Sequence, residues 1–211
     1  MIWIAGICVI CLGVCLPLYM YYKGKLRFPM ACSYKSLGTL CAFLPALVAA
    51  IRLDPHCWFC AVALLLYAVA DTVLEYRFEV GMGVFLAGHI LLIAFFLHLA
   101  PISAYHFIGL LVLGALSAYA LWRSRKQLEK RLPAFILYGA GLIIMCVSAI
   151  ACFSAVSLAG ILIAAGGALF FISDFILFHV VLYPASRPMH WTVMITYYAA
   201  LLCFGISCLQ M

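Results

Sequence analysis

The sequence is poor in charged side chains. They make up 9% of its 211 residues, whereas soluble domains carry about 25%. Hydrophobic residues account for 70% of the chain and aromatic residues for 15%. This composition excludes a water-soluble fold. It leaves no polar segment long enough to form a second domain, so we expect one membrane-embedded domain over residues 1–211.

Apolar runs of about 20 residues are long enough to cross a bilayer as helices. The sequence therefore predicts an all-α, polytopic transmembrane bundle of about eight spans, with prolines near most of the boundaries. The signal that separates the sixth and seventh spans is weak. The predicted spans are Ile2–Tyr22, Ala31–Ile51, Cys57–Tyr76, Val80–Leu99, Ile102–Trp122, Pro133–Phe153, Val156–Tyr183 and Met189–Leu209.

Lysine and arginine are distributed unevenly between the connections. Ten lie in the first, third, fifth and seventh connections, and one, Arg52, lies in the others. By the positive-inside rule, both termini are predicted to face away from the cytosol. The basic residues thus indicate the topology of a multi-pass membrane protein. If the source is bacterial, we expect this membrane to be the inner or plasma membrane. We expect contact with membrane lipids and no nucleic-acid partner.

Several familiar catalytic patterns are missing. No G-x-S-x-G occurs, so a serine hydrolase is disfavoured. The eleven cysteines are scattered mainly through apolar runs, where cysteine packs as a small hydrophobe. Cys57 and Cys60 have C-x-x-C spacing after Asp54 and His56, but no second pair completes a structural zinc site. We predict no metal and no cofactor.

Ionisable side chains at membrane depth are expensive and are functional candidates by default. Lys35, Asp71, His89 and Asp174 lie within the predicted spans. With the predicted topology, all four fall at the middle of the membrane or in its cytosolic half. We therefore expect them to share one cavity in that half of the bundle.

Helical spacing relates these residues to their neighbours. Tyr67, Asp71 and Glu75 recur at intervals of four and form one polar stripe. Glu75 is a candidate for substrate binding, although its place near the span end also fits a solvated turn. Gly167 lies two turns before Asp174, where a small residue permits close helix approach.

Structural interpretations of the same residues remain open. A buried lysine with two aspartates also fits a charge network that only holds helices together. His89 follows Gly88 and also fits a hydrogen bond between helices. His98, His106 and His190 are expected at the membrane interface, and Tyr197-Tyr198 is typical of an aromatic belt as well as of a site.

Two stretches resemble the lysoplasmalogenase (YhhN) family of membrane proteins. The segment 68–96 is similar to the family's small-residue–Asp segment followed by a glycine-led helix with F-x-x-x-H. The segment 167–198 is similar to its Ser-Asp segment and Tyr-Tyr motif, and residues 34–37 resemble its Lys-Pro-Leu element. Three positions depart from the family pattern: Ala70 replaces Gly, Ser36 replaces Pro, and Leu201 replaces Gln.

The resemblance implies hydrolysis of the vinyl-ether bond of lysoplasmalogens to a fatty aldehyde and a glycerophosphoethanolamine or glycerophosphocholine. It implies Asp71, Asp174 and His89 as catalytic residues, with Lys35 and Tyr197 binding the lysophospholipid.

Vinyl-ether cleavage needs a protonated acid, a carboxylate and a dry pocket. Two intramembrane aspartates supply such a pair, because desolvation favours the neutral acid and two neighbouring carboxyls resist double ionisation. Which aspartate is the acid stays open, as do headgroup preference and oligomeric state. His89 would orient one aspartate or shuttle protons, and Lys35 would hold the lipid phosphate.

Two other functions compete with this interpretation. One is a zinc-dependent intramembrane lipid hydrolase resembling alkaline ceramidases, which needs about three convergent histidines. Here His89 and His179 are the deepest candidates. The other is a small proton-coupled carrier that uses the same aspartates, but no inverted repeat supports it.

Overall fold

The computed structural model describes residues 2–155 and 157–211, and these residues are helical with short connections. The first rod joins α1 (Ile2–Cys8), a π-helical stretch (Val9–Cys15) and α2 (Leu16–Gly24). The remaining rods are α3 (Phe28–Arg52), α4 (Cys57–Tyr76), α5 (Phe78–Leu99), α6 (Ala104–Leu128), α7 (Leu132–Ala151), α8 (Leu158–Leu182) and α9 (Arg187–Ser207).

The described residues contain eight long apolar rods, as the sequence predicts. Seven apolar helical runs are long enough to span a membrane, and one of them, Ala104–Ser154, contains both α6 and α7. The weakly marked boundary between the sixth and seventh spans is real, because Ser157 caps the start of α8 with a hydrogen bond from Gly160. Val156, the predicted start of the seventh span, lies outside the described residues.

Two local features differ from the prediction. Helix α6 continues to Leu128 instead of ending at Trp122, and it stops where Glu129 adopts a positive φ of 44°. Arginine and lysine end the apolar span but are good helix formers, so the helix outlasts the span. In the first rod, Pro17 has no N–H to donate one turn back, and the preceding stretch takes i→i+5 bonds instead.

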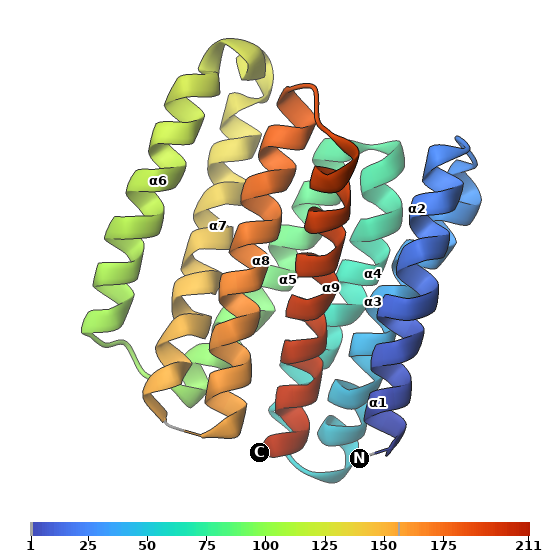
Figure 1. The fold of residues 1–211 in the computed structure, drawn as a ribbon. Helices are drawn as coiled ribbons and strands as arrows, with labels where there is room; N and C mark the ends of the chain where they lie inside the picture. The colour runs from blue at the N-terminus through green and yellow to red at the C-terminus, as the bar shows by residue number, and fades with distance from the viewer. Residues whose placement is uncertain (1, 156) are drawn as a thin grey trace.

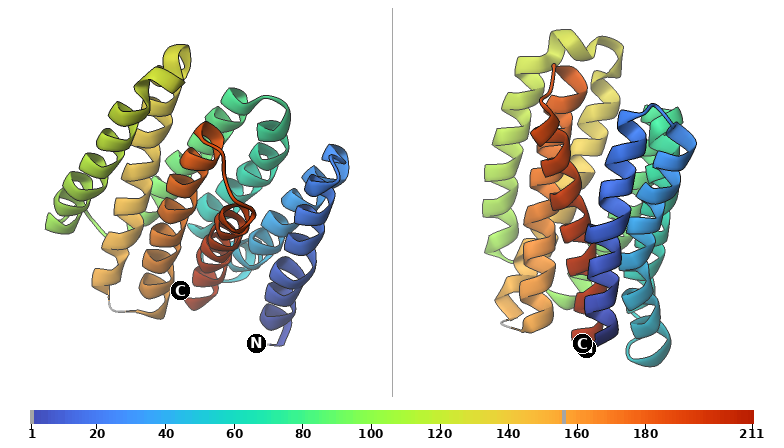
Figure 2. Two further views of the ribbon diagram at one scale, coloured as in Figure 1. Left: turned by 45° about the horizontal axis from the view of Figure 1, so that its top comes forward. Right: turned by 45° about the vertical axis from the view of Figure 1, so that its right-hand side comes forward.

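Six helices form a closed ring. Around it, α3 packs on α4, α4 on α5, α5 on α7, α7 on α8, α8 on α9, and α9 back on α3. The first rod lies outside the ring against α3, and α6 lies outside it against α7, at opposite edges of the bundle (Figures 1 and 2). The ring encloses most of the buried side chains.

The connections rich in lysine and arginine lie at one end of the bundle. The chain termini lie together at the other end (Figure 1). Successive connections therefore lie at alternate ends of the bundle, as the positive-inside prediction assumes. That the basic end faces the cytosol stays a prediction.

Small residues bring the ring helices close together. A methyl group on Gly205 of α9 would overlap the carbonyl oxygen of Ala42 on α3. On α8, a methyl group on Gly167 would lie 2.6 Å from Cβ of Ala149 on α7, as expected for the close approach beside Asp174. Small residues at such crossings let helices pack by van der Waals contact, since lipid supplies little hydrophobic drive between them.

The α3–α9 crossing gives a first prediction. Gly205→Ala should lower the free energy of unfolding by about 1–3 kcal/mol, because the added methyl group meets backbone that cannot move aside. The control is Gly114→Ala on α6, where a methyl group meets nothing within 4 Å. Reversible unfolding in mixed micelles measures both, and equal stability of the two variants would contradict the packing.

Candidate functional site

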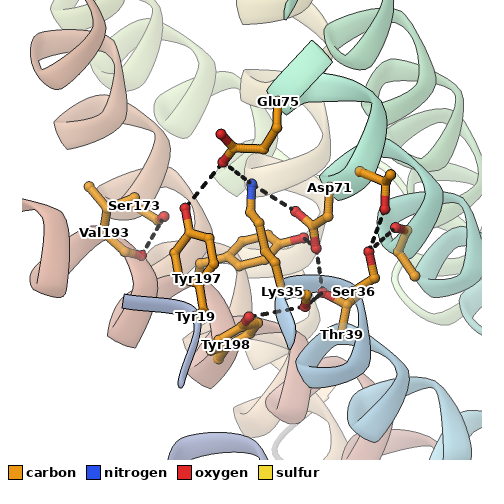
Figure 3. A network of polar contacts seen from close by, with 12 residues as sticks. Tyr19, Lys35, Ser36, Thr39, Asp71, Glu75, Ser173, Val193, Tyr197 and Tyr198 are labelled. Carbon is orange, nitrogen blue, oxygen red and sulfur yellow. Dashed lines mark hydrogen bonds and ion pairs between the residues drawn. The ribbon is translucent and has the colours of Figure 1, made fainter. Parts of the chain in front are cut away.

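A buried ion pair connects α3 to α4. Nζ of Lys35 lies 3.3 Å from Oδ1 of Asp71, and the aspartate side chain is fully buried (Figure 3). The other carboxylate oxygen, Oδ2, accepts hydrogen bonds from the hydroxyls of Thr39 at 2.5 Å and Tyr197 at 3.0 Å. Asp71 therefore has one cation and two hydroxyl donors, which together favour its ionised form.

A second carboxylate continues this network toward the basic end of the bundle. Oε1 of Glu75 lies 3.0 Å from Nζ of Lys23 and 3.9 Å from Nζ of Lys35, and it accepts a hydrogen bond from Tyr19 at 3.2 Å. The side chain of Glu75 is 13% exposed. The solvated-turn interpretation of Glu75 is therefore wrong, because the first rod and α3 supply three partners that cover it.

Asp174 lies across the site on α8 and has different partners. Its Oδ2 accepts a hydrogen bond from the hydroxyl of Tyr138 on α7. In the described part of the chain, no lysine, arginine or histidine forms an ion pair with it. The neighbouring Ser173 donates to the carbonyl of Val193 at 3.0 Å, which ties α8 to α9. Asp174 is thus held by one neutral donor, whereas Asp71 is paired with a cation.

Both aspartates line one cavity of about 540 Å³, a volume typical of ligand sites. Its walls are mostly apolar, and its polar members include Lys23, Lys35, Asp71, Glu75, Tyr138, Asp174, Arg187, His190 and Tyr197. These residues come from α2, α3, α4, α7, α8 and α9. Lys23, Glu75 and Arg187 stand at or near helix ends on the basic side, so the cavity occupies that half of the bundle. Five predicted residues thus come together: Lys35, Asp71, Glu75, Asp174 and Tyr197.

His89 does not line this cavity, contrary to our expectation that it shares the space with Asp71 and Asp174. It is fully buried on α5, and its Nδ1 lies 2.5 Å from the hydroxyl of Tyr67. Its ring also packs against Phe170 and Tyr138, at centroid distances of 5.4 and 5.3 Å. The nearest connection from His89 to a carboxyl therefore runs through Tyr138.

Aromatic side chains fill the interior of the helix ring on one side of the carboxyls, and we call this cluster of Tyr67, Phe85, Phe170 and Tyr197 the aromatic floor. Tyr67 packs on Phe85 and Phe170, with centroids 5.1 and 5.5 Å apart, and Phe170 packs on Tyr197 at 5.8 Å. Phe170 is completely buried, while Phe85 and Tyr197 face the cavity. This aromatic floor fills the space with apolar surface that keeps water from the far side of the carboxyls.

The remaining histidines and the C-x-x-C cysteines lie in separate places. His190 lines the cavity, His179 is exposed on α8, and His98 stacks on His56 at 3.9 Å. The thiol of Cys60 faces the carbonyl of Phe204 on α9, and the thiol of Cys57 faces the carbonyl of Cys208 just after α9. Within residues 2–155 and 157–211, no three His, Cys, Asp or Glu side chains are placed to share a metal ion.

Sequence reasoning missed several hydroxyl groups of the site. Thr39 and Tyr197 donate to Asp71, Tyr138 donates to Asp174, and Tyr19 donates to Glu75. Only Tyr197 was expected. Thr39 follows Lys35 by four residues and so shares its helix face, which is a usable signal. Tyr138 and Tyr19 carry no such signal, because their partners are on distant helices.

The Lys35–Asp71 pair gives a second prediction. Lys35→Met should destabilise the protein by about 3 kcal/mol, because it leaves a buried carboxylate without its cation. The double variant Lys35→Met/Asp71→Asn should recover much of this loss, since neither partner then carries charge. A double-mutant cycle measured by unfolding in mixed micelles checks this, and additive effects of the two substitutions would rule out the pair.

Comparison with known proteins agrees with the motifs in the sequence. The family model described as YhhN family matches residues 30–208, from the first turn of α3 through α9. No curated protein and no solved structure matches the chain. The match covers most of the 211 residues and contains Lys35, Asp71, His89, Asp174 and Tyr197. The chain is a member of the YhhN family.

Proposed function

We propose that this membrane protein hydrolyses the vinyl-ether bond of lysoplasmalogens, releasing a fatty aldehyde and a glycerophospho-alcohol. The observation that carries the proposal is the pair of aspartates from different helices in one apolar-walled cavity. Family membership supports it, because the YhhN family is known for lysoplasmalogenase activity. The substrate is a single-chain amphiphile, which matches a cavity with both charged and apolar walls.

The different partners of the two carboxyls support different roles for them. Asp71 is paired with Lys35 and two hydroxyl donors, so it serves as the ionised carboxylate. Asp174 has no cation partner in the described residues and is held through one oxygen by Tyr138, so it serves as the neutral acid. Such a division between an acid and a base is the arrangement that general acid–base catalysis requires.

The reaction begins with proton transfer to carbon. Asp174 donates its proton to the alkene carbon farther from the ether oxygen, which leaves an oxocarbenium ion at the carbon bonded to oxygen. The Asp71 carboxylate stabilises this cation and takes a proton from water as the water oxygen bonds to the cationic carbon. The product of this step is a hemiacetal. Glycoside hydrolases use a similar pair of carboxyls to form and capture an oxocarbenium-like cation.

Collapse of the hemiacetal returns both carboxyls to their starting states. Asp174 takes the hydroxyl proton as the carbonyl bond forms, and the bond between carbon and the glycerol oxygen breaks. Asp71 gives its proton to that glycerol oxygen. One water is consumed, and the aldehyde and the glycerophospho-alcohol leave the cavity.

Lys35 acts on the carboxylate in this proposal, and this role replaces its expected role as a phosphate ligand. Its ammonium group is already shared between Asp71 at 3.3 Å and Glu75 at 3.9 Å. The side chain is 8% exposed, so it has little surface left for a lipid phosphate. His89 supports Tyr138 by ring packing and does not contact a carboxyl itself.

The alternatives make different predictions for purified protein. A carrier built on the same aspartates would move protons or solute across a sealed membrane and release no aldehyde in detergent. A zinc hydrolase would lose activity on chelation and regain it with zinc. A purely structural charge network would release no aldehyde at all. Aldehyde release in detergent that survives a chelator therefore distinguishes the proposed reaction from the other three interpretations, and proton or solute flux in sealed vesicles separates the carrier from the structural network.

The proposal predicts that both aspartates are needed for turnover. Asp71→Asn and Asp174→Asn, purified in detergent, should each release aldehyde from a lysoplasmenylethanolamine at least about 100-fold more slowly, the usual range for loss of a general acid or base. An ester lysophospholipid of the same chain length should yield no aldehyde with the unmodified protein.

The matched control is Asp54→Asn. Asp54 lies between α3 and α4, outside the cavity, where the backbone N–H and the ring of His56 lower the pKa of its carboxyl. This variant should keep the aldehyde release of the unmodified protein. Full activity in a folded Asp174→Asn or Asp71→Asn protein would refute the catalytic assignment.

A further inference from the structure

The cavity has two chemically different ends. Toward the first rod and the start of α9, it is lined by Lys23, Glu75, Arg187 and His190. Toward α6, α7 and α8, it is lined by apolar side chains, among them Leu121, Leu142, Phe178 and Val181. The first rod and α6 lie at opposite edges of the bundle (Figures 1 and 2), so we infer that the two ends lie on opposite sides of the carboxyls. The cavity is itself amphiphilic.

At the polar end, one cationic side chain has no ion-pair partner among the described residues. Arg187, at the start of α9, is exposed and forms no ion pair within the described residues. It stands three residues before His190 and thus on nearly the same helix face, and both line the cavity. Unlike Lys35, Arg187 is free to pair with an anion, and its guanidinium group suits a phosphate.

The apolar end contains unfilled space at one backbone position. Gly139 of α7 lines the cavity, and a methyl group built there meets no atom within 4 Å. It follows directly after Tyr138, the donor to Asp174. Elsewhere on the ring, the glycines at helix crossings would meet neighbours below 3 Å, as at Gly38 and Gly167. Gly139 therefore leaves room for something other than a neighbouring helix.

We propose that the space between α6, α7 and α8 is the binding compartment for the hydrocarbon chain of a lysolipid. We call this space the chain compartment and define it by Ala120, Leu121, Gly139, Leu142, Phe178 and Val181. The phosphate lies at the opposite end, beside Arg187 and His190. This inference rests on the proposed function for the identity of the lipid, and it adds the direction in which the lipid lies.

The direction agrees with the separate assignment of acid and base. Asp71 is on the side of α3 and the first rod, and Asp174 is hydrogen-bonded to α7 on the side of the chain compartment. In a vinyl ether, the carbon that accepts the proton is one bond nearer the chain than the carbon that becomes cationic. The neutral acid thus lies on the chain side and the carboxylate on the headgroup side, as the chemistry requires.

The test measures which chain length the cavity prefers, with lipids that do not react. Octyl and hexadecyl lysophosphoethanolamines with a saturated ether bond compete for the full-length protein, and native mass spectrometry resolves the two complexes by mass. The unmodified protein should favour the hexadecyl lipid. Gly139→Leu should lower this preference by at least about tenfold, because each methylene kept out of an apolar site lowers affinity about fourfold.

Gly114→Leu is the matched control. Gly114 lies on α6, outside the cavity lining, and a methyl group there also meets nothing within 4 Å. Its preference should stay within about twofold of the unmodified protein, a difference that corresponds to well under one methylene. If Gly139→Leu does not elute as folded protein, Ala120→Leu narrows the same compartment from the side of α6.

Two outcomes would overturn the chain compartment. One is an unchanged preference in Gly139→Leu, and the other is an equal loss of both lipids, which would place the glycine beside the headgroup or the reacting bond. Both lipids lack the vinyl double bond, so this measurement is independent of catalysis. Failure of vinyl-ether hydrolysis with an intact shift in preference would disprove the reaction and keep the chain compartment.

Discussion

The pairing of Lys35 with Asp71 is the interaction on which the rest of the site depends. An isolated carboxylate at this depth would be too costly to keep ionised, and the nearby ammonium group makes that state possible. Thr39 and Tyr197 then fix the carboxylate in place. Among the described residues, Lys35 is the only lysine on the ring helices, and because it is used in this way, Asp174 is left with a neutral donor. The difference between the two aspartates follows from where that single cation lies.

The closed ring of helices holds the two different aspartates on separate helices that face one enclosed space. The carboxyls belong to α4 and α8, which do not neighbour each other in the ring, so the space between them is enclosed by the other helices. The aromatic floor fills the ring on one side, and the basic end opens toward the headgroup region on the other. Charged groups of the first rod and α9 lie to one side of the carboxyls and apolar groups of α6–α8 to the other. A lysolipid has the same order of groups along its length.

Much of this arrangement could be predicted from the sequence. Hydropathy gives the eight rods, and the depths of Asp71 and Asp174 in the predicted topology indicate a common cavity. Pairings between side chains on distant helices could not be predicted. The spacing of Glu75 fitted both a polar stripe and a solvated turn, and only the position of the first rod decides between them. His89 has the right depth but faces Tyr67, because depth does not determine which way a side chain points around its helix.

We propose that one aspartate is neutral and the other ionised in the resting protein. Infrared spectroscopy tests this directly, because a protonated carboxyl has a carbonyl stretch that an ionised carboxylate lacks. We expect such a band in the unmodified protein, its loss in Asp174→Asn and its persistence in Asp71→Asn. A band lost in Asp71→Asn and kept in Asp174→Asn, or no such band in the unmodified protein, would contradict it.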